Sequence, residues 1–164
     1  MKIMIMGHGG HGKDEAARIL CEILELKYLG SSWAACDAFI FDSLAAPLGY
    51  RTRSECYAGR RDWRTLWGEL MAAYNARDAA RLGRYVYAQA DVYVGVRRVE
   101  EFHAIKAEGL FDVAIWVDAL GRLPPESVSS CTVGPELADL VLNNNGTLAD
   151  LKSECMILAG LLKK

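Results

Sequence analysis

The stretch that decides the fold is IMIMGHGGHGKD, residues 3–14. Its first four residues, Ile3–Met6, form a short continuous apolar run, as expected of a buried parallel strand. Gly7–Lys13 then fits the pattern G-x-x-x-x-G-K, and a helical pattern begins directly after it. Glycines let successive backbone N–H groups turn inward around an anion, and a helix start adds partial positive charge. Strand, loop, lysine and helix together predict a nucleotide phosphate site in which Lys13 reaches the β- and γ-phosphates.

The alternative is a glycine-rich turn that binds nothing. His8 and His11 are three residues apart, a spacing that zinc can use, but the only other histidine is His103 and no third ligand cluster is near. We therefore expect both histidines to line a phosphate loop. The residues expected to contact the donor nucleotide are Gly7, His8, Gly9, Gly10, His11, Gly12, Lys13, Asp14 and Glu15.

The residue after the loop lysine departs from the usual pattern. A Ser or Thr hydroxyl normally coordinates Mg²⁺ at this position, but the chain has Asp14, followed by Glu15. A carboxylate is also a hard oxygen ligand, so Asp14 could bind the metal directly or through water. It could equally stabilise the helix start, where a negative charge is favourable. Both interpretations stay open, and Asp14 is the one candidate metal ligand.

The rest of the chain alternates between strand and helix patterns. Short apolar runs typical of strands occur at 3–6, 91–96, 112–117 and 140–142, and helical spacing occurs at 16–24, 63–74, 79–90, 99–108 and 148–162. Thr147 and Asp150 resemble a capping box for the last helix. The apolar face expected for that helix consists of Leu148, Leu151, Cys155, Leu158 and Leu162. This alternation predicts an α/β fold with a parallel sheet covered on both faces.

Composition agrees with one globular domain over residues 1–164. Of the 164 residues, 52% are hydrophobic and 24% are charged, which excludes a disordered chain. The 19 basic and 21 acidic residues give a formal charge of −2, which argues against a general nucleic-acid coat protein. We therefore expect no stable nucleic-acid partner.

Cysteine usage and the N-terminus predict a cytoplasmic protein. The five cysteines are scattered without a CxxC pair, which favours reduced thiols over a disulfide framework or a zinc ribbon. The first apolar run reaches glycine after six residues, too soon for a secretory signal. No run approaches the roughly 18 apolar residues of a membrane span. We expect no association with a membrane.

Five arginines fall within fourteen residues of an otherwise slightly acidic chain: Arg51, Arg53, Arg60, Arg61 and Arg64. The planar guanidinium can donate two parallel hydrogen bonds to a phosphate. As a set they predict a second anion site, for the phosphate of an acceptor; a solvated helix face paired with Glu55 and Asp62 is the alternative. Trp63, Trp67 and Tyr74 give the following helix an apolar stripe, which we interpret as core.

Three further groups are expected near the phosphates. Arg97 and Arg98 follow a strand directly, and ligands of open parallel sheets bind beyond the carboxyl ends of the strands. The Asp that usually helps to bind Mg²⁺ at the end of this strand is missing. Asp118 is a carboxylate at the end of the next strand, and the alternative for it is that it only forms a turn. Residues 122–130 are the most loop-like stretch, and a mobile segment that carries Arg122 could close over the phosphates. An ordinary surface loop stiffened by Pro124 and Pro125 is the alternative.

These blocks together resemble the bacteriophage deoxynucleoside monophosphate kinases, a branch of the P-loop nucleotide kinases. The resemblance rests on Gly7–Asp14 and on residues 91–102, 110–118, 122–130 and 138–148, in one order along nearly the whole chain. It implies transfer of the γ-phosphoryl group of ATP, with Mg²⁺, to a deoxynucleoside monophosphate in the (host) cytoplasm. It also implies a three-layer fold with about five parallel strands, a helical acceptor-binding insertion near 42–90 and a lid-like loop at 119–136.

Residue by residue, the resemblance assigns the donor phosphates to Gly7, Gly12 and Lys13, and the strand-end position to Arg97. It assigns the acceptor side to Arg60, Arg61 and Arg64, and the loop that passes the donor adenine to Asn144, Asn145 and Gly146. Lys13, Arg97 and Arg122 would offset the charge that develops during transfer. Glu15 departs from the Thr of related chains, and acceptor-base contacts match no motif.

Other functions stay open at this point. A second small-molecule kinase, such as a dephospho-coenzyme A kinase, would use the same scaffold. A non-catalytic nucleotide-binding regulatory module is favoured by the missing Ser/Thr and strand-end Asp. A nucleic-acid end kinase is disfavoured by charge and length. The sequence leaves the accepted bases undetermined and is compatible with a homodimer.

Overall fold

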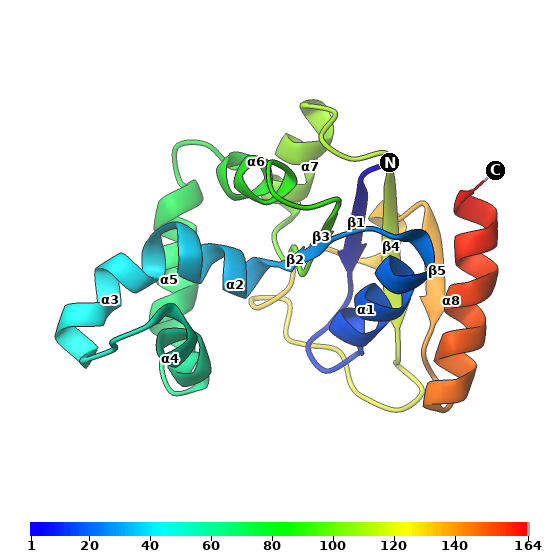
Figure 1. Ribbon diagram of the computed structural model, residues 1–164, viewed down its shortest axis with the longest axis horizontal. Helices are drawn as coiled ribbons and strands as arrows, with labels where there is room; N and C mark the ends of the chain where they lie inside the picture. Colours follow the sequence, from blue (N-terminus) through cyan, green and yellow to red (C-terminus); the bar gives the residue numbers. More distant parts are fainter. Residues whose placement is uncertain (164) are drawn as a thin grey trace.

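The central feature of the computed structural model, which describes residues 1–163, is one five-stranded parallel sheet (Figure 1). Its strands are β1 (Ile3–Met6), β2 (Tyr28–Gly30), β3 (Val92–Val94), β4 (Val113–Asp118) and β5 (Leu140–Asn143), in the order β2-β3-β1-β4-β5. β1 is the middle strand and pairs with β3 on one side and β4 on the other. The loop that follows β1 therefore begins at the centre of the carboxyl edge of the sheet. The predicted α/β fold is confirmed.

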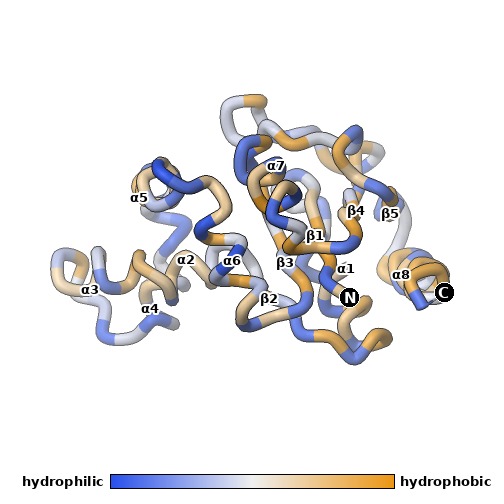
Figure 2. The backbone as a smooth tube through the Cα atoms, turned by 90° about the horizontal axis from the view of Figure 1, so that it is seen from above, coloured by the Kyte–Doolittle hydropathy of each residue, from blue (hydrophilic) through white to orange (hydrophobic). Residues whose placement is uncertain are grey.

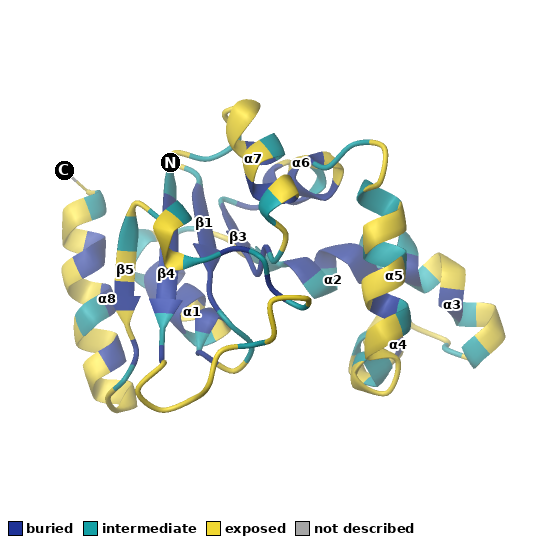
Figure 3. Cartoon of the chain, turned by 180° about the vertical axis from the view of Figure 1, so that it is seen from behind, coloured by how far each residue is buried: buried dark blue, intermediate teal, exposed yellow. Residues whose placement is uncertain are grey.

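Helices cover both faces of the sheet, and the alternation of side chains along β1 shows how. Ile3 and Ile5 point into a core formed with α1 (Lys13–Leu24) and α8 (Leu148–Leu162). Met4 and Met6 point into the opposite core, with α6 (Arg81–Tyr87) and α7 (Val99–Ala107). A strand buried on both faces needs an unbroken apolar sequence, which explains the run that the sequence shows. Figure 3 shows the inner strands β1, β3 and β4 mostly buried, whereas the edge strand β5 is partly exposed.

The connection from β2 to β3, residues 31–91, contains helices and turns but no strand. It contains α2 (Ser31–Ala35), a π-helical turn η1 (Cys36–Ile40), α3 (Phe41–Leu48), α4 (Arg53–Ala58), a 3₁₀ turn η2 (Gly59–Arg61) and α5 (Arg64–Asn75), and it ends with α6. In Figures 1 and 2, α3, α4 and α5 project beyond the sheet, while α2 leads from β2 to them. Aromatic contacts hold this part together: Phe39 stacks on Tyr74 with ring centroids 4.0 Å apart.

Several details differ from the sequence expectations. Of the aromatic stripe, Trp67 is buried as predicted, but Trp63 precedes α5 and is 42% exposed, so its assignment to the core was wrong. In α8 the Thr147–Asp150 capping box is confirmed, whereas Leu148 is exposed and does not belong to the buried face. The residue patterns did not predict β2, α2, α3 or α4 individually, because each is short and lacks a clear period; the resemblance implied only a helical insertion near 42–90. Among residues 1–163, no helix combines the length and apolar character needed to cross a membrane.

Candidate phosphate-binding site

The glycine-rich loop joins the end of β1 to the start of α1. Gly10 and Gly12 have φ values of +78° and +87°, in the left-handed region that other residues rarely adopt. Gly12 has a second constraint, because a β-carbon there would collide with the side-chain amide of Asn144. Gly7 lies so close to β4 that a β-carbon would come within 2.7 Å of the Val117 carbonyl oxygen. The glycines of the motif are therefore required by conformation and by close packing.

Lys13 is buried at the first position of α1, and its Nζ donates a hydrogen bond of 2.6 Å to the carbonyl oxygen of His8. The ammonium group is thus folded back over the loop. Burial lowers the pKa of Lys13 from its usual value, and the nearby Arg97 charge lowers it further. An anionic phosphate oxygen is a stronger acceptor than a neutral carbonyl, so this hydrogen bond can pass to a ligand.

The two loop histidines anchor the loop. His11 is fully buried, and its Nδ1 accepts the backbone N–H of Ala119 at 3.2 Å, which leaves Nε2 to donate to the Pro124 carbonyl oxygen at 3.4 Å. His8 packs edge-on against Trp116, with ring centroids 5.1 Å apart. Burial and the neighbouring His11 lower the pKa of His8. His11 therefore connects the phosphate loop to the segment that follows β4.

Glu126 is the main residue of the site that sequence reasoning missed. Its carboxylate accepts the backbone N–H of Gly9 at 2.6 Å, pairs with Arg64 at 2.8 Å and forms a close ion pair with Arg97. Burial opposes ionisation of this group, but the hydrogen bond and charge of Arg97 and the Gly9 N–H lower the pKa of Glu126 to about 2. No local pattern distinguishes this Glu from other surface acids; only the fold brings it to the loop.

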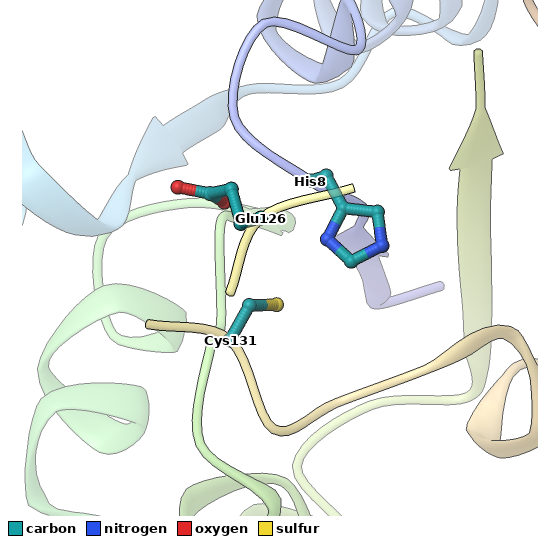
Figure 4. A group of neighbouring side chains, drawn as sticks. All are labelled: His8, Glu126 and Cys131. Atoms are coloured by element: carbon teal, nitrogen blue, oxygen red, sulfur yellow. The ribbon is translucent and has the colours of Figure 1, made fainter. Parts of the chain in front are cut away.

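His8, Glu126 and Cys131 form a small cluster whose potential ligand atoms all lie within 4.8 Å of one another (Figure 4). Two observations count against a Mg²⁺ site in this cluster. Mg²⁺ prefers oxygen ligands, whereas a thiol and an imidazole supply two of the three ligand atoms here. The Glu126 carboxylate is already neutralised by two arginines, and Lys13 adds positive charge nearby. The cluster therefore does not fit a Mg²⁺ site.

The predicted arginines separate into two groups. Arg64 and Arg97 meet at the phosphate loop through Glu126. Arg60 instead lies over the Tyr57 ring, 3.9 Å from its centroid, and donates to the Tyr57 carbonyl oxygen at 2.9 Å. Arg61 is exposed and lines a surface groove of about 460 Å³ with Arg64. Arg60 and Arg64 therefore have different partners, and η2, which contains Arg60, ends before α5 begins.

The loop after β5 lies beside the phosphate loop. Asn144 is buried and its Nδ2 donates to the His11 carbonyl oxygen at 2.9 Å, while its own carbonyl oxygen accepts Arg122 Nε at 2.8 Å. Asn145 accepts the N–H of Gly121 at 2.6 Å and donates to Asp118 at 3.0 Å. Asp118 thus stabilises the turns beyond β4 and β5, which favours the turn-forming interpretation. Arg122 is held at the edge of the site.

Gly146 completes that loop and is exposed next to Asp150 of the capping box. The structure therefore brings Asn144 into contact with the phosphate loop. The contacts of Asn145 and Gly146 are with other parts of the chain. Contacts of these three residues with an adenine remain a prediction.

The two acidic residues after Lys13 differ in their surroundings. Glu15 forms an ion pair of 2.6 Å with Arg18 on the surface of α1. The exposed Asp14 carboxylate forms neither a hydrogen bond nor an ion pair with any of residues 1–163 and lies near Gly30, at the carboxyl end of β2. A hard, uncommitted carboxylate at the start of α1 fits a Mg²⁺ ligand, and the close-packed glycine loop with buried Lys13 fits the phosphates of ATP.

Comparison with known proteins agrees on the fold. Neither the protein-family models nor the curated protein sequences gave a match to the chain. Among solved structures, shikimate kinase from Bacteroides thetaiotaomicron superimposes with a TM-score of 0.54 at 11% identity, covering 100% of this chain and 99% of that one. TT1252 from Thermus thermophilus gives a TM-score of 0.53 at 21% identity, with 99% and 97% covered. The chain therefore has the three-layer P-loop kinase fold.

Proposed function

We propose that this chain is a P-loop phosphotransferase that transfers the γ-phosphoryl group of Mg-ATP to a (deoxy)nucleoside 5′-monophosphate. The observation that carries the proposal is the meeting of Arg64 and Arg97 at the phosphate loop, from two different parts of the fold. Arg97 follows β3, and Arg64 begins α5 in the helical connection that projects beyond the sheet. Guanidinium groups at this point would bind an acceptor that carries its own phosphate.

The protein groups act by position and charge. Lys13 and the loop N–H groups would hold the donor phosphates, while Arg97 and Arg64 would align the acceptor phosphate and offset charge on the transferred group. Arg122 lies near the start of residues 119–136, the segment that covers the phosphate loop. Mg²⁺, with Asp14 as its candidate protein ligand, would neutralise the β- and γ-phosphates.

The carboxylate that contacts the loop, Glu126, is a poor general base while it is paired with arginine, which favours an acceptor phosphate over an acceptor hydroxyl. A hydroxyl must lose a proton, and a general base works best with a pKa near the working pH. The carboxylate that lies in the site, Glu126, has a pKa of about 2 and is therefore a weak proton acceptor. The phosphate of a nucleoside monophosphate is already an anion and needs no base.

The test is ADP release measured across an acceptor panel of nucleoside and deoxynucleoside monophosphates, dephospho-coenzyme A, shikimate and gluconate. We expect turnover with one or more monophosphates and at least a hundredfold loss in Lys13→Ala. Turnover confined to dephospho-coenzyme A or to an alcohol would reassign the acceptor. Full activity of Lys13→Ala would refute the mechanism.

A non-catalytic nucleotide-binding module is the second candidate. It is favoured by the Asp at position 14, where the motif normally has a metal-binding hydroxyl, and by Gly95-Val96-Arg97 in place of a strand-end Asp. Binding of Mg-ATP without turnover of any acceptor in the panel would identify this alternative.

A further inference from the structure

The segment between β4 and β5 covers the phosphate loop directly. Leu123 lies above Gly10, with a side-chain carbon 3.6 Å from where a Gly10 β-carbon would be. The Pro124 carbonyl oxygen faces His11, and the Glu126 carboxylate lies against Gly9, where a β-carbon would come within 2.9 Å of its oxygen. Three consecutive parts of the loop are thus contacted by residues 123–126.

Within this segment, Glu126 makes the contacts expected of a bound anion. One carboxylate oxygen accepts the Gly9 N–H and pairs with Arg97, and the other oxygen pairs with Arg64. The side chain is only 13% exposed, whereas Arg64 is 73% exposed. A carboxylate with cationic donors on both oxygens presents the same charge and hydrogen-bonding pattern as two oxygens of a phosphoryl group.

The origin of the three donors indicates which phosphoryl group this is. Gly9 belongs to the loop expected to hold the donor, Arg64 to the helical connection expected to hold the acceptor, and Arg97 to the strand end between them. A group that contacts all three lies between donor and acceptor. That is the position of a phosphoryl group during transfer.

We propose that Glu126 is an internal competitor for the phosphoryl site: its carboxylate occupies the oxyanion position formed by Gly9 N–H, Arg64 and Arg97 until an anionic ligand displaces it. The proposal rests on the proposed function only in assigning this position to the transferred group. Displacement would release Arg64 and Arg97 to the incoming phosphates and lift residues 123–126 from the loop at the same time.

The segment is built so that its middle can move while its ends stay in place. At one end Ala119 donates to His11 at 3.2 Å, and at the other Thr132 donates from its backbone N–H to the Arg97 carbonyl oxygen at 2.8 Å. Between these anchors, Leu123, Pro124 and Pro125 are exposed, so lifting them uncovers little apolar surface. Glu126 provides the strongest contacts of this middle part with the loop.

The test measures binding of tripolyphosphate, which has the phosphates of ATP but no base, by titration calorimetry. If the carboxylate occupies the site nine-tenths of the time, the apparent affinity is about tenfold below the intrinsic one. We therefore expect Glu126→Gln to bind tripolyphosphate about tenfold more tightly than the unmodified chain, and Glu126→Ala to show a gain of similar size. Thermal unfolding of both variants checks that they are folded.

Two controls locate the effect. Glu136→Gln removes the same charge from an exposed residue of the same segment, in the 3₁₀ turn η3 (Pro135–Leu137), and should leave the affinity unchanged. Lys13→Ala combined with Glu126→Gln should lose the gain, because the phosphate loop is then disabled. An equal gain in Glu136→Gln would indicate a general charge effect and overturn the proposal.

The outcomes separate this proposal from the proposed function. Equal or weaker tripolyphosphate binding by folded Glu126→Gln refutes the internal competitor, even if the chain transfers phosphoryl groups. Tighter binding without turnover of any acceptor supports the internal competitor and refutes the transfer reaction.

Discussion

Nδ1 of His11 accepts the backbone N–H of Ala119 at 3.2 Å, so one buried side chain of the phosphate loop orients the segment that covers this loop. Both partners are buried, and the N–H of Ala119 leaves the sheet just beyond β4, where no neighbouring strand accepts it. A buried N–H that loses its acceptor costs about 1–3 kcal/mol. The loop and its cover are thus coupled by a hydrogen bond as well as by the Glu126 ion pairs.

His11→Ala is predicted to lower the free energy of unfolding by about 2–4 kcal/mol, because it removes this acceptor and leaves a cavity. His11→Asn retains an acceptor near the position of Nδ1 and should recover part of the loss. Urea unfolding measures both variants. His103→Ala, at an exposed position of α7, is the control and should change stability by less than about 0.5 kcal/mol; equal losses in His11→Ala and His103→Ala would contradict the coupling.

Gly12→Ala is predicted to be both destabilised and impaired in phosphate binding. The residue has φ +87°, and a β-carbon would collide with the Asn144 amide, so the change forces the loop and Asn144 apart. We expect a loss of about 1–3 kcal/mol and at least tenfold weaker tripolyphosphate binding.

Gly68→Ala is the matched control for that substitution. Gly68 is an exposed residue within α5, and a β-carbon there meets no atom within 4 Å. Alanine is the better helix former by about 1 kcal/mol, so this variant should be slightly more stable. Denaturation that finds Gly12→Ala as stable as Gly68→Ala would show that the loop conformation is not the constraint.

The sequence allowed the sheet to be predicted where local pattern determines it. Ile3–Met6 is buried on both faces, and a parallel strand in that position needs a continuous apolar run. Edge strand β2 escaped prediction because three residues with an exposed Tyr28 carry no such run. The glycine-rich turn between β1 and α1 was predictable because its glycines and lysine are adjacent in sequence, and phosphate binding by it stays a prediction.

The rest of the site depends on contacts between distant residues. Glu126 is 117 positions from Gly9 and 62 from Arg64, so no spacing in the sequence reveals that they meet. Arg60 and Arg64 have a spacing typical of one helix face, yet a 3₁₀ turn ends between them. Pairing across the fold, rather than residue type, determined which arginines reach the loop.

Asp14→Asn distinguishes the two roles left open for this residue. If its carboxylate binds Mg²⁺, the variant should require roughly tenfold more Mg²⁺ for half-maximal turnover, with little change in stability. If it only stabilises the start of α1, stability should fall by about 0.3–1 kcal/mol and the Mg²⁺ requirement should not change. Glu22→Gln, on the exposed surface of the same helix, controls for the loss of one charge. Metal titration of the turnover rate, together with thermal unfolding, decides between the two roles.

Glu101→Gln is predicted to stabilise the protein above neutral pH. Glu101 is buried in the first turn of α7 and accepts the Tyr93 hydroxyl at 2.8 Å; burial raises its pKa from 4.5 to about 7, and the Tyr93 hydrogen bond offsets only part of that shift. Because the folded state holds this proton more tightly than the unfolded state, stability is lost as pH rises from 4.5 through about 7. A shift of this size corresponds to about 3 kcal/mol at pH 8, which Gln avoids while still accepting the Tyr93 hydroxyl. The measurement is the difference in unfolding free energy between Glu101→Gln and the unmodified chain from pH 4 to pH 8. This difference should grow across that range. For Glu100→Gln, the exposed neighbour, the difference from the unmodified chain should not change with pH. Parallel curves for the two variants would show that Glu101 is not the group that titrates.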